Sequence, residues 1–517
     1  MLHVREPSAA GNPAILRAID GIDERRLHWT VLAAGLALTL AAATTSDSVF
    51  QVDEHFQVVE FASHKLGITP AEALAWEFPA RIRPWLQPGA YALIARGLRA
   101  VGLESPFAAV RAFRIASGIA AWTAIAVLLV AVRRWFPSPR WRRAVTLSLA
   151  LPYFVPYLAA RVSSESVATT FLLLGLAAIV GFPGDAARRE GATWVRHIAA
   201  GLALGLAFEA RFQVGISVAG IVLWVLVHDP DRWRKVTALS AGLLVALAIG
   251  GAVDAWGYGA WELVPWNYLR ANLVEGRAAA FGTSPWHGYL WMAAGLWPPF
   301  GIVLTLGLLL SWFRAPRHLL TWATVPFVVV HSLIGHKEIR FLFPMLPLAT
   351  LAVLLAWSGP PPERRWEART LRVLAVVWFG RATWAFNVLG LAALCLLPST
   401  DNLELQRFFH DHAREPARWV ALDDPRRFHG APVPFLWPRP MPTVEVVRDA
   451  AGLAAALQAG PGPVYVTAKY PLPAGAEEVL ARRGSRIFAS LPAWLSRFDA
   501  FGWLKRADMT YVWRVDR

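Results

Sequence analysis

Long uncharged apolar runs recur along most of this 517-residue chain. Each run is near the ~20 residues that an α-helix needs to cross a bilayer. Helices are the expected structure for such runs, because lipid offers no hydrogen-bond partners to an exposed backbone. The pattern predicts about eleven membrane-spanning helices, at residues 28–46, 115–132, 144–160, 167–183, 198–210, 212–228, 238–253, 288–312, 319–335, 341–357 and 372–397.

Two of these predictions depend on a single interruption. Glu209 and Arg211 divide one long apolar run into residues 198–210 and 212–228. If the run were one helix, every later loop would lie on the other side of the membrane. The first apolar run follows a charged N-terminal stretch without a small-residue cleavage site, so we expect it to be a retained helix.

Composition and charge agree with a membrane protein. The chain is 56% hydrophobic and only 17% charged, against roughly one-quarter charged residues in soluble domains. Its net charge of +15 comes mainly from arginines in short loops that fall on one side if the helices alternate. We assign that side to the cytoplasm and expect no nucleic-acid partner. The single cysteine, Cys395, excludes a disulfide framework and a cysteine-based metal site.

The loops on the opposite side carry most of the unusual residues. The first of them, residues 47–105, is too long and too patterned for a simple connector. Apolar and polar residues from Phe56 to His64 predict a helix lying on the bilayer surface. A second short helix is predicted from Pro70 to Trp76, with Thr69 as its N-cap.

Asp53 and Glu54 precede the first of these helices and allow two interpretations. They could cap or hydrate an interfacial helix, because carboxylates suit a helix N-terminus. Alternatively, one of them acts as a general base that takes a proton from an acceptor hydroxyl during nucleophilic attack. The residues alone leave both open.

A second candidate is the turn HKEIR at 336–340, between two apolar runs. His336, Lys337 and Arg340 could together hold a lipid phosphate, the arginine in bidentate fashion and the lysine as a point charge. Snorkelling at the interface is the alternative, and it explains one such residue better than three.

Three further features have plainer explanations. The loop at 254–287 is rich in Trp, Tyr, Asn and Gly, which suits sugar recognition but also an interfacial aromatic belt. The pairs Arg161 with Glu165 and Glu209 with Arg211 are interpreted as structural neutralisation at helix ends. The Asp-x-Asp at 229–231 lies in a short arginine-rich loop, and we interpret it as a solvated turn.

The tail beyond residue 398 contains more charge and no spanning run. We divide the chain into a transmembrane domain at 1–397 and a small extracytoplasmic α/β domain at 398–517. Helices are expected near 448–458 and 475–483. Strands are predicted at 443–447, 463–469, 485–491 and 510–515.

Three motifs, in this order, resemble glycosyltransferase family 22, the GPI-anchor and asparagine-linked-glycan mannosyltransferases. DEHFQVVEFASHKLG with AWEFPARIRPWLQP is similar to the family's first extracytoplasmic loop. YGAWELVPWNYLRANL with FGTSPWHGYL resembles its aromatic loop, and HKEIRFLFPMLP its HKE-x-RF signature. The resemblance extends from about residue 53 to 347.

The resemblance implies a polytopic α-helical membrane enzyme of the GT-C type, using a polyprenyl-phosphate sugar as donor, most often mannose. The acceptor would be a glycan or a glycolipid, and one displacement implies inversion. The active face would be periplasmic or would face the lumen of the endoplasmic reticulum. No cofactor and no metal are implied, because lysine and arginine can neutralise a phosphate leaving group.

The resemblance also implies roles for particular residues. Asp53 corresponds to the base and Glu54 to its neighbour or an acceptor-orienting group. The donor phosphate would be held by His336, Lys337 and Arg340. The sugar and acceptor pocket would be shaped by Trp76, Glu77, Trp286, His287 and Tyr289.

The sequence departs from the family pattern in places that leave the acceptor and linkage open. Val52 stands where a proline usually precedes the acidic pair, and AWE at 75–77 replaces TWE. The alternatives are another GT-C enzyme, of the protein mannosyltransferase or lipid A aminoarabinose transferase type, and a lipid or glycan transporter without chemistry. The second and third motifs argue against the former, and the absence of an evident repeat argues against the latter.

Overall fold

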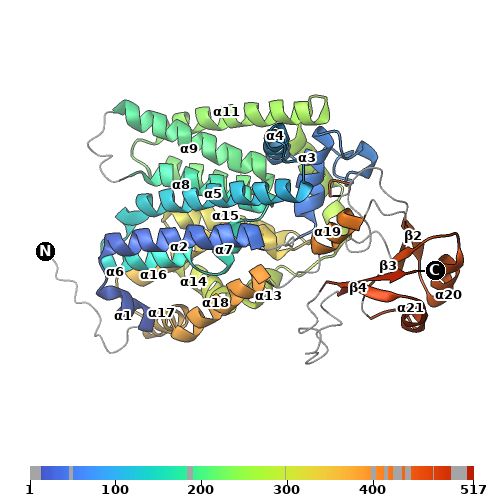
Figure 1. The fold of residues 1–517 in the computed structure, drawn as a ribbon. Coiled ribbons are helices and arrows are strands. Elements are labelled where there is room, and N and C mark those ends of the chain that lie inside the picture. The colour runs from blue at the N-terminus through green and yellow to red at the C-terminus, as the bar shows by residue number, and fades with distance from the viewer. Residues whose placement is uncertain are drawn as a thin grey trace. The chain divides into compact units, whose positions relative to one another are not determined.

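A computed structural model describes residues 13–45, 51–182, 190–296, 298–396, 403–412, 417–422, 434–436, 444–469, 471–490 and 509–516. The chain forms two compact units (Figure 1). Unit 1 comprises residues 1–43, 76–89 and 114–391, and unit 2 comprises residues 44–75, 90–113 and 392–517.

All the regular secondary structure among the described residues of unit 1 is helical. It contains α1 (Ala14–Asp20), most of α2 (Glu24–Thr45) and α5 (Pro106–Val132), α6 (Pro139–Ala150), α7 (Phe154–Ala159), α8 (Ser164–Val180), α9 (Glu190–Ala210), α10 (Gly215–His228), α11 (Arg232–Tyr258), α12 (Val264–Leu269), α13 (Gly288–Leu296), α14 (Phe300–Arg314), α15 (Leu319–Leu333), α16 (Leu346–Ser358), α17 (Arg365–Trp378) and most of α18 (Arg381–Leu396). Short 3₁₀ or π turns connect several of them, among them η4 (Arg133–Trp135), η6 (Phe212–Val214), η7 (Arg270–Val274), η8 (Arg277–Phe281) and η9 (Ile339–Met345).

Each predicted span coincides with a helix or a broken pair of helices. The interruption at Glu209 and Arg211 is real, because α9 ends at Ala210 and the next turn begins at Phe212. Three predicted spans are broken: 144–160 into α6 and α7, 288–312 into α13 and α14, and 372–397 into α17 and α18. Proline explains part of this, since Pro298 and Pro299 cannot continue a helix across that point.

Four helices of the described residues are long and apolar enough to cross a membrane by length and composition. They are Glu24–Thr45, Pro106–Trp135, Arg232–Tyr258 and Ile339–Ser358, and a fifth results if the bent pair at α17 and α18 is one span. Four shorter apolar helices, Ser164–Val180, Phe212–His228, Phe300–Arg314 and Leu319–Leu333, accompany them. A total of eleven spans therefore stays a prediction.

Glycines set the close packing of α9 on α11, which run side by side (Figure 1). A Cβ at Gly201 would lie 2.0 Å from the Leu239 carbonyl, and one at Gly242 would lie 2.0 Å from that of Ile198. Gly201 and Gly205 have the small-xxx-small spacing that lets helix backbones approach closely in lipid. Any side chain at these positions would force the two helices apart.

The segment at 76–89 is anchored on the C-terminal end of α11. The backbone N–H of Trp85 donates to Asp254 Oδ1 at 2.7 Å, and the Tyr258 hydroxyl donates to the Arg83 carbonyl at 2.8 Å. The Trp85 ring packs on Gly257, where an added Cβ would lie 2.1 Å from it. These contacts hold against α11 the segment that also carries Trp76 and Glu77.

Unit 2 begins with the acidic stretch, which is helical as predicted. A π-helical turn, η2 (Glu54–Val59), continues into α3 (Glu60–Lys65). The expected separation of polar and apolar faces is wrong at Glu60, which is as deeply buried as Val59 and Phe61. The hydrogen bonds described below compensate the burial of this carboxylate.

The second predicted helix of the loop is wrong. Only a three-residue 3₁₀ turn, η3 (Ala71–Ala73), forms there, and no side chain caps it. Pro70 is extended with ψ of 155°, and the Thr69 hydroxyl donates to Glu60 instead of the turn. Thr69 therefore stabilises the preceding helix rather than starting a new one.

The rest of unit 2 includes α4 (Leu86–Ala100) from Ala90 onward, α19 (Leu403–His412) and a five-stranded sheet. The strands are β1 (Arg418–Leu422), β2 (Val444–Val447), β3 (Val464–Lys469), β4 (Ser485–Ala489) and β5 (Thr510–Val515), in the order β2-β1-β3-β5-β4. β1 pairs in parallel with β2 and β3, whereas β5 pairs antiparallel with β3 and β4.

Alternation along the strands gives the sheet two buried faces. Val420 and Val466 face α20 (Ala450–Gln458) and α21 (Ala476–Arg483), whereas Trp419 and Tyr465 pack with Phe409 of α19. The four predicted strands and both predicted helices are confirmed, and β1 was missed. The boundary proposed at residue 398 stays a prediction.

Candidate active site

The three predicted cations lie in unit 1, His336 and Lys337 in the turn that follows α15 and Arg340 in the first turn of η9. We call residues 336–340 the cation turn. Lys337 is buried, and its Nζ donates to the carbonyls of Ser284 (3.2 Å) and Ile334, 5.9 Å from the centre of the Tyr289 ring. Burial lowers the pKa of the Lys337 ammonium. His336 is held between the Gly282 carbonyl, 2.9 Å from Nδ1, and a carboxylate that was not among the predicted site residues.

That carboxylate is Glu338, the third residue of the HKEIRF motif. It lies 3.1 Å from His336 Nε2 and accepts two hydrogen bonds from Arg340, at 2.7 Å from Nε and 2.9 Å from Nη2. Arg340 is therefore held through a bidentate pair, which fixes the plane of its guanidinium. Glu338 lies two residues after His336 and two before Arg340, and this spacing could have indicated that it pairs with both.

A second carboxylate approaches Arg340 from α8. Glu165 Oε1 lies 3.8 Å from Arg340 Nε and 3.1 Å from Arg211 Nη1. The structure shows a pairing that was not predicted, between Glu165 and Arg211, and it places the Arg161 guanidinium over the Tyr157 ring at 4.4 Å. The interpretation of Arg161–Glu165 and Glu209–Arg211 as neutralising pairs stays a prediction. Glu165, Arg211 and Arg340 lie at the ends or breaks of helices that are far apart in sequence. Their spacing along the chain therefore does not reveal that they meet.

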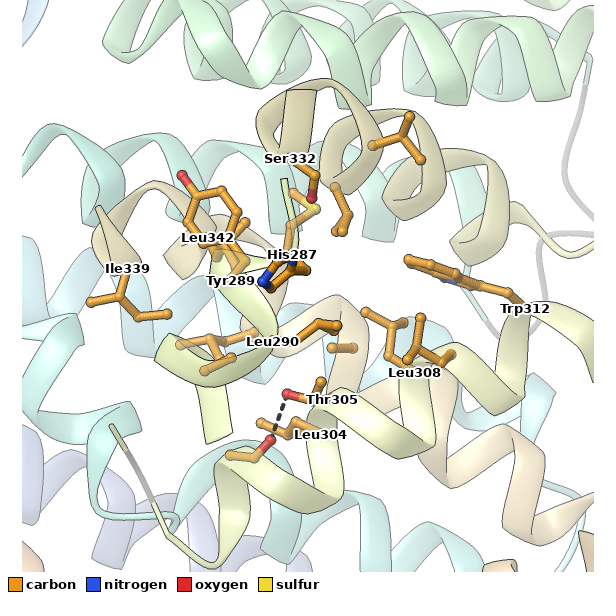
Figure 2. A pocket seen from close by; sticks show the side chains of 18 of the residues that line it. His287, Tyr289, Leu290, Leu304, Thr305, Leu308, Trp312, Ser332, Ile339 and Leu342 are labelled. Atoms are coloured by element: carbon orange, nitrogen blue, oxygen red, sulfur yellow. Dashed lines mark hydrogen bonds between the residues drawn. The ribbon is translucent and has the colours of Figure 1, made fainter. Parts of the chain in front are cut away.

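An apolar cavity of about 510 Å³ (Figure 2) adjoins this segment through Ile339, which lines the cavity and lies between Lys337 and Arg340 in sequence. Tyr289 also forms part of its wall, and Lys337 Nζ lies 5.9 Å from the centre of the Tyr289 ring. Of its polar groups, the Thr305 hydroxyl is already bonded to the Gly301 carbonyl, as the dashed line in Figure 2 shows. Its lining comes from α13, α14, α15, η9 and α16, and includes Trp286, His287, Leu290, Leu304, Leu308, Trp312, Ser332, Leu333, Leu342 and Ala349.

The predicted aromatic residues divide into two groups. Trp286, His287 and Tyr289 line this cavity, with Trp286 largely exposed and Tyr289 buried. Trp76 instead stacks on Phe281 at 6.4 Å, and Phe281 lies 6.0 Å from His336. Phe281 thus links Trp76 to the cation turn, although Phe281 was not among the predicted site residues.

Glu77 is engaged in an ion pair beside this group. Its carboxylate lies 3.3 Å from Arg83 Nη2, and Glu77 is buried. The Arg277 guanidinium lies over the Trp76 ring at 5.4 Å. Unit 1 therefore brings together eight of the ten predicted site residues, in a cation turn, an apolar cavity and the adjoining aromatic group.

Asp53 and Glu54 belong to unit 2. Asp53 is half-buried at the start of η2 and makes no side-chain capping hydrogen bond, so the capping interpretation lacks its expected contact. Glu54 is buried in the first turn. The predicted approach of Asp53 to Arg340 stays a prediction.

A polar network next to Asp53 was not anticipated. Glu60 Oε1 lies 2.8 Å from His55 Nε2 and accepts the backbone N–H of Phe435 at 3.2 Å, while its other oxygen accepts from Thr69. The Ser63 hydroxyl extends the network, 2.6 Å from the Thr69 hydroxyl. The side chains of His55, Glu60, Ser63 and Thr69 are all buried. The network ties the acidic helix to residues 434–436 of the tail.

The Asp-x-Asp stretch is a partly exposed turn, as interpreted from the sequence. Both carboxylate oxygens of Asp229 accept from Lys235 Nζ, at 2.8 and 2.7 Å, and Asp229 Oδ1 also accepts the N–H of Asp231 at 2.9 Å. These contacts satisfy Asp229 locally. Among the described residues, no group of three His, Cys, Asp or Glu side chains is placed to hold a metal ion.

Comparison with known sequences decides the family. Residues 29–415 match the Alg9-like mannosyltransferase family. The chain belongs to this family. The membership confirms the resemblance found in the three motifs. The match covers both the cation turn and the acidic stretch.

Individual relatives within this Alg9-like family are distant. Mannosyltransferase APTG1 of Arabidopsis thaliana is 25% identical over 61% of this chain and 56% of its own length. GPI alpha-1,2-mannosyltransferase 3 of Danio rerio is 26% identical over 60% of this chain and 56% of its own. GPI mannosyltransferase 3 of Yarrowia lipolytica is 28% identical over 69% of this chain and 68% of its own. The chain thus spans little more than half the length of the first two relatives.

Solved structures confirm the predicted GT-C fold. ArnT from Cupriavidus metallidurans, crystallised with undecaprenyl phosphate, superposes with a TM-score of 0.55 at 14% identity, over 94% of this chain and 97% of ArnT. Apo ArnT gives a TM-score of 0.53 at 13% identity, with the same coverage. At this identity the likeness concerns the fold alone.

Proposed function

We propose that this protein transfers mannose from a polyprenyl-phosphate donor to a hydroxyl of a glycan or glycolipid acceptor, with inversion at the anomeric carbon. The observation that carries the proposal is in unit 1, where a cation turn adjoins a largely apolar cavity. A polyprenyl phosphate has the matching chemistry, an anionic head on an isoprenoid chain.

The cations would bind the donor's phosphate. Lys337 Nζ lies 5.9 Å from the ring centre of Tyr289, a residue that lines the cavity, and Arg340 lies three residues further along the chain. Buried cations stabilise a phosphate strongly, because few waters compete with them. Lys337 Nζ is held by two carbonyl oxygens and supplies a positive charge for the phosphate.

The cavity would receive the first isoprene units of the donor. At about 510 Å³ it lies within the usual range for small-molecule sites. Leucine is the commonest residue of its wall, and four lining side chains are exposed at the surface: Trp286, Leu290, Val329 and Leu333. The longer remainder of the lipid would leave past these side chains into the bilayer. Support also comes from the ArnT fold, since that protein was crystallised with undecaprenyl phosphate.

Asp53 would act as the general base in this reaction. The acceptor oxygen attacks the anomeric carbon, its proton passes to Asp53, and the bond from that carbon to the phosphate oxygen breaks. The polyprenyl phosphate leaves with the negative charge that Lys337 and Arg340 neutralise. A single displacement inverts the anomeric carbon and needs no second carboxylate as nucleophile.

The acceptor class follows from the relatives. Those named for GPI mannosyl transfer point to a glycolipid or glycan hydroxyl rather than a protein side chain. We place the reaction on the extracytoplasmic face, because the site residues fall on the arginine-poor side of the membrane. The test is a transfer assay with purified protein and polyprenyl-phosphate mannose, in which the lipid product lacking sugar and the mannosylated acceptor appear together.

A further inference from the structure

Arg340 is held on two sides by carboxylates from different parts of unit 1. Glu338 pairs with it within the turn, at 2.7 and 2.9 Å. Glu165, at the start of α8, lies 3.8 Å from its Nε. Glu165 is more than 170 positions away in sequence (340 minus 165) and is almost completely buried, with 2% exposed.

Glu165 is itself fixed by its surroundings. Ser163 caps α8 by accepting the N–H of Ser166 at 3.2 Å, which places Glu165 in the first helical turn, where a carboxylate is favoured. Glu165 Oε2 accepts from the Ser164 hydroxyl at 3.3 Å, and that hydroxyl accepts from Arg211 Nη1 at 2.8 Å. Glu165 Oε1 lies 3.1 Å from the same Arg211 nitrogen.

Arg211 completes the arrangement from the break between α9 and η6. Its guanidinium lies over the Phe341 ring at 5.0 Å, and that of Arg340 lies over the same ring at 5.5 Å. Two like charges on one ring repel each other unless a negative charge is shared between them. Glu165 provides that charge.

We propose that Glu165 is a positioning residue for donor binding: held by Arg211, it keeps the Arg340 guanidinium oriented to receive the donor's phosphate. This inference rests on the proposed function, because it assumes that Arg340 binds that phosphate. Glu165 itself touches no substrate in this account. It acts through Arg340.

The sign of the effect separates positioning from simple electrostatics. Five charged side chains of this cluster are compared: three are cationic and two anionic, which leaves one net positive charge (three minus two). They are Arg211, Lys337 and Arg340 against Glu165 and Glu338. If Glu165 contributed charge alone, neutralising it would strengthen phosphate binding. If it orients Arg340, neutralising it weakens binding, because the guanidinium then turns toward its remaining partners.

The experiment measures the Kd of undecaprenyl phosphate for the full chain in detergent, with undecaprenol as the uncharged comparison. Glu165→Gln is expected to raise the Kd by about tenfold, the effect of losing ~1.4 kcal/mol, and to leave undecaprenol binding unchanged. Glu209→Gln is the matched control, since Glu209 is a buried carboxylate two residues from Arg211 that packs against Gly250.

Action through Arg340 is tested by a double-mutant cycle. In an Arg340→Ala background, Glu165→Gln should change the Kd by less than about twofold, because coupled residues are non-additive. An equal loss in both backgrounds, an unchanged Kd, or tighter binding overturns the inference. Should Glu165→Gln fail to fold, Glu165→Asp is the second variant, because it keeps the negative charge but withdraws the carboxylate oxygen that Arg211 and Arg340 share. It should then weaken binding several-fold, and wild-type affinity overturns the inference.

The same measurements separate the two proposals. If Lys337→Ala and Arg340→Ala bind undecaprenyl phosphate as tightly as the wild type, the phosphate site itself is wrong and this inference falls with it. If both weaken binding and Glu165→Gln does not, only the positioning role is wrong.

Discussion

His55 and Glu60 form a fully buried contact, with Nε2 of the histidine 2.8 Å from Oε1 of the glutamate. Five residues apart, they are joined by the π-helical turn η2, which leads into α3. Glu60 also accepts hydrogen bonds from Thr69 and from the backbone of Phe435. One carboxylate thus organises the helix next to Asp53.

Glu60→Ala should therefore destabilise the protein by about 3 kcal/mol, the usual cost of removing one partner from a buried network. The reason is that His55, Thr69 and the Phe435 N–H all lose their acceptor. The measurement is the thermal unfolding of the purified protein. Glu72→Ala is the control, because Glu72 is exposed in η3, and it should leave the Tm unchanged. A Tm equal to the wild type in Glu60→Ala would show that the network contributes nothing.

Removing a cation from the turn should weaken donor binding. Lys337→Ala and Arg340→Ala are each expected to raise the KM for the lipid donor by about tenfold to a hundredfold, as for a lost charge-assisted hydrogen bond. Steady-state kinetics with varied donor measure this. Arg270→Ala is the control, because Arg270 pairs with Glu275 at an exposed site. If Lys337→Ala and Arg340→Ala have the same donor KM as Arg270→Ala, the assignment of Lys337 and Arg340 to the donor's phosphate is contradicted.

The state of Lys337 also predicts a pH dependence. Burial lowers the pKa of its ammonium from the usual 10.5, so the charged form is lost as pH rises through that lowered value. The donor KM should accordingly rise on the alkaline side, at a pH below 10.5. In Lys337→Arg the rise should move to higher pH, because arginine keeps its proton. An alkaline limb that Lys337→Arg leaves in place would assign it to another group.

Filling the cavity should discriminate between donors of different chain length. Ala293→Phe projects a ring into the apolar space beside Leu290 and Leu304 and should raise the KM for a long-chain polyprenyl donor. A donor truncated to one isoprene unit should be affected least. Leu389→Phe adds volume on the exposed face of α18 and serves as control. Equal sensitivity of both donors to Ala293→Phe would argue that the lipid lies elsewhere.

Hydropathy alone predicted the helical architecture well. A helix that crosses a bilayer needs a long apolar run, and charged residues are costly inside lipid, so they separate one run from the next. Hydropathy located even the break at Arg211. Alternation predicted four strands in the tail, whereas β1 was missed because the run RWVAL at 418–422 is short and follows a charged segment. The breaks within spans, such as that at Pro298, were readable in principle from proline.

The candidate site was predicted less completely. The cation turn and the aromatic loop follow from their motifs, and unit 1 places them around one cavity. Partners across the fold, such as Glu165 with Arg211 or Glu60 with Phe435, depend on how helices pack, and no local spacing encodes them. The sequence pattern predicted Glu60 on the polar face of its helix. The pattern could not show that the backbone of Phe435, 375 residues away, donates a hydrogen bond to this carboxylate.

The most direct test of the central claim compares the wild type with Asp53→Asn in mannosyl transfer from a polyprenyl-phosphate mannose donor, alongside binding of the same donor. The account predicts that Asp53→Asn binds the donor like the wild type but transfers no mannose, because the acceptor hydroxyl has no base. Transfer at the wild-type rate by Asp53→Asn would contradict it.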